Sequence, residues 1–189
     1  LSIPLSNVSG TNAALRKTGA GSLWLNAANT FPGGVAVDAG VVRVLNASGA
    51  GTGAIAVASG ALLDLSATGV FSNLVSGAGS LVKSANGSLT LPGVNTYAGG
   101  TLLSNGTMRV ASAASLGAGS VALTNGASLV FTASQTVSAS DVARISGAGG
   151  VLAASGATVV WSGDYAVSSS LALDAEAGGT LAVGQLTGS

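Results

Sequence analysis

Apolar side chains alternate with polar or small ones along most of the chain. Eight segments share the form glycine, one or two residues, apolar, any residue, apolar. They begin at Gly21, Gly40, Gly60, Gly87, Gly106, Gly126, Gly156 and Gly179. Most of them follow another short alternating segment and a polar turn. Alternation with a period of two residues predicts β-strands that bury one face.

A second, longer period covers the same segments. Residues 81–110 are identical to residues 15–44 at thirteen of thirty positions, with Leu81 aligned to Leu15. Residues 146–152 in turn resemble residues 76–82, with Ser146 aligned to Ser76. Such self-similarity is typical of proteins built from stacked structural repeats.

The long period favours a β-solenoid over a sandwich. A strand-turn-strand unit of about twenty residues cannot bury its inner face alone, but stacked copies of it can. A sandwich has strands at similar intervals, but it gives no reason for the repetition. We therefore expect one all-β segment over 1–189, a parallel β-helix of about eight rungs, with three rungs in each long repeat of about 66 to 70 residues. The repeat copies are expected at about 15–80 and 81–150, with a partial copy at 151–189.

Stacked rungs place equivalent side chains in columns through the core. The two apolar positions of the eight segments predict two inward columns, which consist almost entirely of aliphatic side chains. The first column is Leu23, Val42, Leu63, Leu89, Met108, Leu129, Val159 and Leu181. The second is Leu25, Val44, Leu65, Leu91, Val110, Phe131, Trp161 and Val183.

Composition limits the chemistry that the chain can carry. Charged residues make up 6%, six basic residues balance six acidic ones, and His and Cys are absent. Zero net charge offers no basic surface for nucleic acid, and the absence of His removes the commonest general base. No run of about twenty apolar residues predicts a membrane-spanning helix. We expect no enzymatic activity, no cofactor, no metal site and no nucleic-acid partner.

The remaining polar and aromatic residues are weak candidates for a site. The acids are expected in turns or at single outward positions, although Asp38 and Asp64 could meet between rungs, and Asp174 and Glu176 are close in sequence. A paired-carboxylate site needs a defined cleft, so a solvated turn is the favoured interpretation of the last two. The set of acids considered is Asp38, Asp64, Asp141, Asp164, Asp174 and Glu176. The aromatic residues considered for sugar stacking are Trp24, Phe71, Trp161 and Tyr165, and Trp24 is expected to point outward, as are Arg43 and Arg109.

One polar motif recurs in both copies. It consists of Asn29, Thr30, Phe31, Gly33 and Gly34 in the first copy and Asn95, Thr96, Tyr97, Gly99 and Gly100 in the second. A ligand contact is one interpretation. We favour a structural corner, in which Asn and Thr side chains cap backbone groups, the aromatic ring covers the edge and the two glycines permit the next bend.

The second copy resembles the passenger-associated repeat of bacterial autotransporters, also called the autotransporter-associated β-strand repeat. The first copy departs from it at Ala27, Phe31 and Val35, and the third copy has lost the Asn-Thr-Tyr-Gly-Gly core. The residues that carry the resemblance are Leu81, Lys83, Gly87, Leu89, Leu91, Gly93, Asn95, Thr96, Tyr97, Gly99, Gly100, Thr101, Gly106, Met108 and Val110.

The resemblance implies a right-handed parallel β-helix in a secreted or cell-surface passenger of a Gram-negative bacterium. Such passengers cross the outer membrane with the help of a C-terminal translocator barrel, which is not part of this sequence. The function expected is that of a stiff structural rod. An adhesin that binds a host or neighbouring-cell surface is the alternative, and a polysaccharide-acting enzyme is a distant one.

The two ends of the sequence suggest a further hypothesis. The chain begins at Leu1 without Met, "LSIPLS" starts inside a repeat and "GQLTGS" stops inside a rung. Open end rungs have unpaired backbone groups that another chain can pair with. We therefore expect either a segment of a longer passenger or head-to-tail stacking of copies into a fibre.

Overall fold

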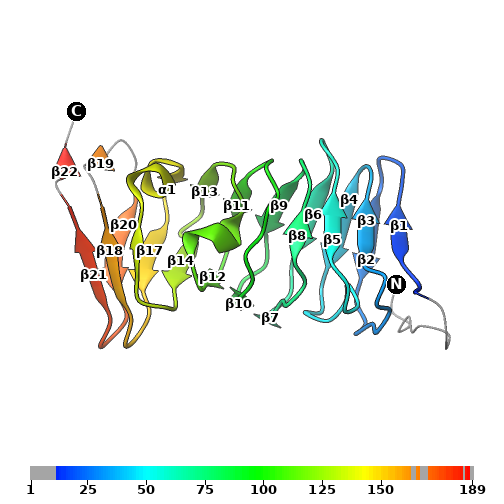
Figure 1. Ribbon diagram of the computed structural model, residues 1–189, viewed down its shortest axis with the longest axis horizontal. Coiled ribbons are helices and arrows are strands. Elements are labelled where there is room, and N and C mark those ends of the chain that lie inside the picture. Colours follow the sequence, from blue (N-terminus) through cyan, green and yellow to red (C-terminus); the bar gives the residue numbers. More distant parts are fainter. Residues whose placement is uncertain (1–11, 163–164, 167–169, 185, 188–189) are drawn as a thin grey trace.

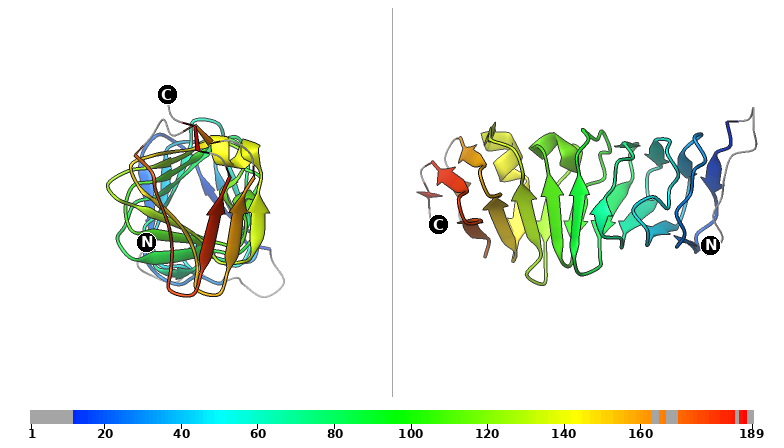
Figure 2. Two further views of the ribbon diagram at one scale, coloured as in Figure 1. Left: turned by 90° about the vertical axis from the view of Figure 1, so that its left-hand side faces the viewer. Right: turned by 90° about the horizontal axis from the view of Figure 1, so that it is seen from below.

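The chain forms one elongated rod. The computed structural model describes residues 12–162, 165–166, 170–184 and 186–187. The rod has β1 (Leu15–Lys17) near one end and β22 (Leu186–Thr187) near the other (Figure 1). Seen along its axis, successive turns overlie one another around a closed outline (Figure 2). The described strand pairs are parallel, and the predicted all-β solenoid of about eight turns is confirmed.

Most strands fall into four parallel sheets that run along the rod. Sheet A contains β1, β3 (Val35–Val37), β5 (Ile55–Val57) and β8 (Val75–Ser76). Sheet B contains β2 (Ser22–Leu25), β4 (Val41–Val44), β6 (Leu62–Leu65), β9 (Ser80–Lys83), β11 (Thr101–Leu103), β13 (Val121–Leu123) and β16 (Ile145–Gly147). Sheet C contains β7 (Gly69–Val70), β10 (Ser88–Leu91), β12 (Thr107–Val110), β14 (Ser128–Phe131), β17 (Gly150–Ala153) and β20 (Ala172–Ala175). Sheet D contains β15 (Gln135–Val137), β18 (Thr158–Trp161) and β21 (Thr180–Val183), and β19 (Tyr165–Ala166) pairs with β22.

Each turn of the rod takes about twenty residues. In sheet A, Leu15 pairs with Val35, Val35 with Ile55 and Ile55 with Val75, always twenty residues further along. Three short sides and their corners account for this length, because most strands have only three or four residues. Adjacent turns are therefore hydrogen-bonded neighbours, roughly 4.8 Å apart.

The interior is aliphatic, because every second strand residue points inward. Of the sixteen residues predicted for the columns, Leu23, Leu181 and Val183 are partly buried and the other thirteen are buried. Most of these thirteen have no exposed surface at all. The side chains of successive turns thus form one continuous core along the rod.

The prediction of two uninterrupted columns is wrong at two places. Leu63 pairs with Leu81, not with Leu89, and Leu129 pairs with Val151, not with Val159. The spacing between the segments is longest at these two points, since it covers one full turn plus one further side of the rod. The eight segments are therefore distributed over sheets B, C and D instead of lying in one sheet.

Each long repeat of the sequence begins one side further around the rod than the repeat before it. In the first copy β1 and β2 lie in sheets A and B, whereas their equivalents β9 and β10 in the second copy lie in sheets B and C. The similarity of 146–152 to 76–82 follows the same rule, because β8 in sheet A and β9 in sheet B correspond to β16 in sheet B and β17 in sheet C. The long repeat is therefore three turns plus one side, not three rungs.

The described helices are short and lie at corners. A 3-10 helix covers Ala113–Leu116, and α1 covers Ala139–Ala143. The turn from Val121 to its partner Ile145 is longer than the turn from Thr101 to Val121, and α1 accommodates the extra residues. Among the described residues, no helix has the length and apolar character needed to cross a membrane.

Candidate functional site at the repeated corner

Asn95 ties three successive turns together. Its Oδ1 accepts a hydrogen bond from the N–H of Val75 in the preceding turn, at 2.8 Å. Its Nδ2 donates to the carbonyl of Ser115 in the following turn, at 2.6 Å. The backbone N–H of Asn95 donates to Ala114 at 3.0 Å. Because the side chain is buried, these bonds replace strand pairing where the ladder is interrupted.

The first copy makes the same contacts to the following turn. Asn29 is buried and its Nδ2 donates to the carbonyl of Gly49 at 2.5 Å. Two turns after Asn29, Asn73 donates from Nδ2 to the carbonyls of Gly51 and Gly53 in the intervening turn, at 3.0 and 2.6 Å. The amide groups on this side of the rod are thus directed at backbone carbonyls of neighbouring turns.

The threonines of the motif differ from this pattern. Thr30 and Thr96 are exposed, and within the described part of the chain neither hydroxyl forms a hydrogen bond. The predicted capping of backbone groups therefore comes from the asparagines and not from these threonines.

The aromatic residue lies inside the rod and not over its edge, which corrects the prediction. Tyr97 is fully buried, and its hydroxyl is 2.5 Å from Oγ1 of Thr101. Thr101 in turn donates to the carbonyl of Leu116 at 2.9 Å. Burial raises the pKa of Tyr97 to about 12, so the phenol keeps its proton. Since Thr101 gives its only proton to Leu116, Tyr97 must be the donor to Thr101.

The first copy lacks both hydroxyls of this pair. Phe31 and Val35 occupy the positions of Tyr97 and Thr101, and both are buried. A buried hydroxyl without a partner is unfavourable, so the two positions are expected to change together. The partner role of Thr101 was missed from the sequence, although this matched difference between the copies could have indicated it.

The paired glycines allow adjacent turns to approach closely. A Cβ on Gly33 would lie 2.5 Å from the carbonyl oxygen of Ala13, and one on Gly99 would lie 2.5 Å from that of Gly79. The second glycines, at 34 and 100, have φ values of 80° and 94°, which favour glycine.

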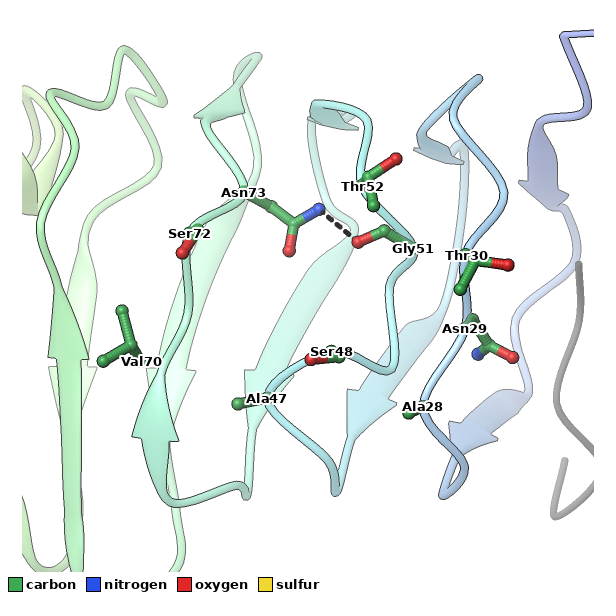
Figure 3. A pocket seen from close by; sticks show the side chains of 10 residues that line it. All are labelled: Ala28, Asn29, Thr30, Ala47, Ser48, Gly51, Thr52, Val70, Ser72 and Asn73. Atoms are coloured by element: carbon green, nitrogen blue, oxygen red, sulfur yellow. Dashed lines mark hydrogen bonds between the residues drawn. The ribbon is translucent and has the colours of Figure 1, made fainter.

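An open groove of about 450 Å³ lies beside the first corner (Figure 3). Its lining offers methyl groups, hydroxyls and backbone, and it includes no charged side chain. Asn73 is drawn with its amide turned toward the carbonyl of Gly51, so the lining amide is already engaged. The lining residues are Ala28, Asn29, Thr30, Ala47, Ser48, Gly51, Thr52, Val70, Ser72 and Asn73.

The equivalent groove of the second copy has a volume of about 670 Å³, and residues of α1 together with Arg144 form part of its wall. Arg144 donates to the carbonyls of Gly119 and Ala113 at 2.9 and 2.8 Å, and to Asp141 at 3.0 Å. Gly119 corresponds to Gly53, so Arg144 occupies the place of Asn73. This role of Arg144 was also missed, because the helix lies where the offset between the first two copies changes from 66 to 70 residues, so the first copy has no aligned counterpart for it.

Comparison with known proteins identifies the repeated unit. Residues 15–44 and 81–110 each match the passenger-associated-transport-repeat family. The chain carries two copies of this repeat. The resemblance seen in the sequence is thereby confirmed, and together with the β-solenoid the repeats fit a segment of an autotransporter passenger. Neither a curated protein nor a solved structure matches the chain.

The two passenger-associated transport repeats present their corners on different sides of the rod. The corner of the first repeat lies between β2 of sheet B and β3 of sheet A, and that of the second lies between β10 of sheet C and β11 of sheet B. The two grooves therefore do not form a row along one face.

Each repeat also directs a lysine into the corner that precedes its second strand. Lys83 is fully buried and its Nζ donates to the carbonyl of Ala85. Burial lowers the pKa of Lys83, while the charge of Asp64 opposes this effect. In the first repeat, Lys17 donates to the carbonyl of Gly19 at 2.6 Å. Both ammonium groups are thus bound by the backbone.

The outward residues of sheet B form a short ladder within the first repeat. Trp24 is opposite Arg43, and Arg43 is opposite Asp64. The guanidinium lies 5.3 Å from the centre of the Trp24 ring and 2.6 Å from a carboxylate oxygen of Asp64. Trp24 is 48% exposed, so it points outward.

The acids do not form the carboxylate pairs considered above. Asp38 binds Arg16 at 2.5 Å, and Asp64 binds Arg43 and accepts from Ser66 and Ser84. In the described part of the chain no three His, Cys, Asp or Glu residues are grouped so that they could hold a metal ion.

Two of the aromatic residues considered for sugar stacking are inaccessible. Phe71 and Trp161 are buried in the core. Asp164 and the side chain of Tyr165 lie outside the described residues.

Arg109 connects distant turns along the outer face of sheet C. Its two terminal nitrogens donate to the two carboxylate oxygens of Glu176, at 2.6 and 3.1 Å. The register places Val130 and Leu152 on the two intervening turns. The hydrogen bond from Arg109 lowers the pKa of Glu176, as does a second one from the N–H of Ser155.

Proposed function

We propose that the chain is a stiff rod within a secreted or cell-surface passenger of a Gram-negative bacterium. The observation that carries the proposal is that the asparagine and the tyrosine of the recurring corner motif form their hydrogen bonds within the rod. Both ends of the Asn95 amide bind the backbone of adjacent turns, and the Tyr97 hydroxyl is enclosed in the core. The motif therefore serves the geometry of the rod, and we assign it a structural role.

The arrangement of the two repeats supports this role over that of an adhesin. Surfaces that bind an extended partner repeat their contact groups along one face. Here the grooves of the two repeats lie on different sides of the rod, and the amides that line them are engaged internally. About eight turns spaced by roughly 4.8 Å give a rod of roughly 38 Å.

Self-association along the axis is a second element of the proposal. Residues 1–109 contain five Lys and Arg and two Asp, whereas residues 110–189 contain one Arg and four acids. Such opposite charge favours head-to-tail over head-to-head contact. A contact of this kind does not close on itself, so it extends into a fibre.

Electron microscopy with light scattering of the isolated chain tests both elements. Uniform rods of about eight turns that lengthen end to end with concentration would support rod and fibre alike. Monodisperse rods would support the rod and reject the fibre, and globular particles would reject both.

The role in the parent passenger needs a separate experiment. We would replace this segment by a flexible Gly/Ser linker with the same number of residues and measure the distance from the outer membrane to an epitope placed beyond it. A Gly/Ser linker of 189 residues has an r.m.s. span of roughly 75 Å, against roughly 38 Å for the rod, so a rod predicts a longer and more variable distance with the linker. An unchanged distance would contradict the proposal.

A further inference from the structure

Three Asn-Gly pairs stack at one corner of the rod. Asn86-Gly87 joins β9 to β10, Asn105-Gly106 joins β11 to β12, and Asn125-Gly126 joins β13 to β14. The three pairs connect sheets B and C in successive turns. Their corners have four, three and four residues, and of the three asparagines only Asn125 has a positive φ, of 52°.

The pairs differ in how their side chains are held. Nδ2 of Asn105 donates to the carbonyl of Ser84, and Nδ2 of Asn125 donates to that of Ser104, both at 3.1 Å. The N–H of Gly126 is also engaged, with Ala148 at 3.3 Å.

Asn86 has no such restraint. It is exposed, and among the described residues neither its carboxamide nor the N–H of Gly87 has a hydrogen-bond partner. In the described structure, the corner that joins β6 to β7 in the preceding turn offers Asn86 no hydrogen bond of the kind that Asn105 and Asn125 form.

We propose that Asn86 is a site of spontaneous deamidation, and that it reacts faster than Asn105 and Asn125. A base from solvent removes the proton of the Gly87 N–H, and the nitrogen attacks Cγ of Asn86. The C–N bond of the carboxamide breaks and ammonia leaves with a proton from solvent, which forms a cyclic succinimide. Water then adds to either carbonyl of the ring and opens it to aspartate or isoaspartate.

The hydrogen bonds decide the order of the rates. The side-chain carbon must come close to the glycine nitrogen before reaction, and a tethered carboxamide must first break its bond. Each such bond is expected to slow the reaction roughly two- to tenfold. We therefore expect Asn86 to react first, Asn105 more slowly and Asn125 most slowly, because Asn125 and Gly126 are both bound.

The product changes the electrostatics of the chain. Six basic residues balance six acidic ones, so each deamidation turns a net charge of zero into one negative charge. The added negative charge therefore allows the modified chain to be separated on an anion-exchange column, which detects the reaction independently of mass spectrometry.

The test is a time course on the folded chain at mildly alkaline pH, followed by peptide mass spectrometry of the three sites. Asn86→Gln should remove the fast phase, and the matched control Asn105→Gln should leave it unchanged. In urea the three rates should converge, because the tethers are lost. A folded chain in which Asn86 reacts no faster than Asn105 or Asn125 would overturn the proposal, as would the same order of rates in urea.

Discussion

At the scale of single residues, the rod depends on polar groups that are buried and paired. Tyr97 and Thr101 form a hydrogen-bonded chain to the backbone of Leu116, and the first repeat replaces the pair by Phe31 and Val35. The same site is thus filled by a hydrogen-bonded pair in the second repeat and by an apolar pair in the first. The residue type that is tolerated at one of the two positions therefore depends on the residue at the other.

Exchanging the polar and the apolar pair between the two repeats tests this dependence. Tyr97→Phe loses one hydrogen bond and should cost about 1 kcal/mol, whereas Thr101→Val leaves a buried phenol without an acceptor and should cost about 2 kcal/mol. The double variant should cost clearly less than the sum, as measured by urea denaturation. In the first repeat, Phe31→Tyr should be destabilising and Val35→Thr should partly restore stability. Strictly additive effects would show that the residues are independent.

The asparagine of the corner has a larger expected effect. Asn95→Ala removes the partners of the Val75 N–H and the Ser115 carbonyl, so it should lower the free energy of unfolding by about 3 kcal/mol. The neighbouring Thr96→Ala is the control and should change it by less than about 0.5 kcal/mol, since Thr96 is exposed and unbonded. Equal effects of the two variants would argue against the role assigned to Asn95.

At the scale of elements, contacts between strands extend over several turns. Arg109 in β12 binds Glu176, which follows β20, and between them lie two further strands of sheet C. The ion pair therefore stabilises the stacking of strands whose sequence positions are far apart. Its bidentate geometry favours the charged form of both groups.

This ion pair predicts a pH dependence of stability. The pKa of Glu176 lies below its ordinary value of 4.5 in the folded chain. A lowered pKa contributes stability above the ordinary value, and the contribution is lost as the pH falls through the lowered one. Glu176→Gln should thus be less stable than the wild type at neutral pH, and the difference should shrink on acidification.

Urea denaturation at several pH values measures this difference. Asp174→Asn is the matched control, because Asp174 is an exposed acid in β20 without an ion-pair partner among the described residues. A difference between Glu176→Gln and wild type that does not vary with pH would contradict the assignment.

At the scale of the whole molecule, stability is distributed along the axis. Each turn contacts chiefly its two neighbours, so the fold behaves as a one-dimensional stack. Such a stack should tolerate the loss of one complete turn, provided that the remaining strands keep their register.

Excision of one turn tests this property. Thr101 pairs with both Leu81 and Val121, so removing 101–120 brings Val121 opposite Leu81 and Leu129 opposite Leu89. We expect this variant to unfold cooperatively, at a moderately lower temperature, and to form a rod shorter by about 4.8 Å in solution scattering. Removing only 101–110 takes out half a turn and should abolish the cooperative transition. Similar behaviour of both deletions would contradict a stack in strict register.

Much of this architecture is determined by the sequence alone. Period-two alternation locates the strands and inward residues such as Leu25 and Val44, because the pleat turns successive side chains to opposite faces. The long sequence repeat predicts stacked turns, because short units can bury their inner faces only against each other. The corner motif was found in the same way, since equivalent positions in the two repeats have the same packing requirements.

Only the tertiary structure decided which strands are neighbours. The step along the chain from Leu63 to its partner Leu81 is shorter than the step from Val121 to Ile145, because the corners between strands differ in length. A period measured along the sequence counts these corner residues together with the strands. It therefore cannot distinguish a repeat of three turns from a repeat of three turns plus one side. Likewise, the Tyr97–Thr101 contact depends on how a corner folds back into the core, and local alternation carries no information about that path.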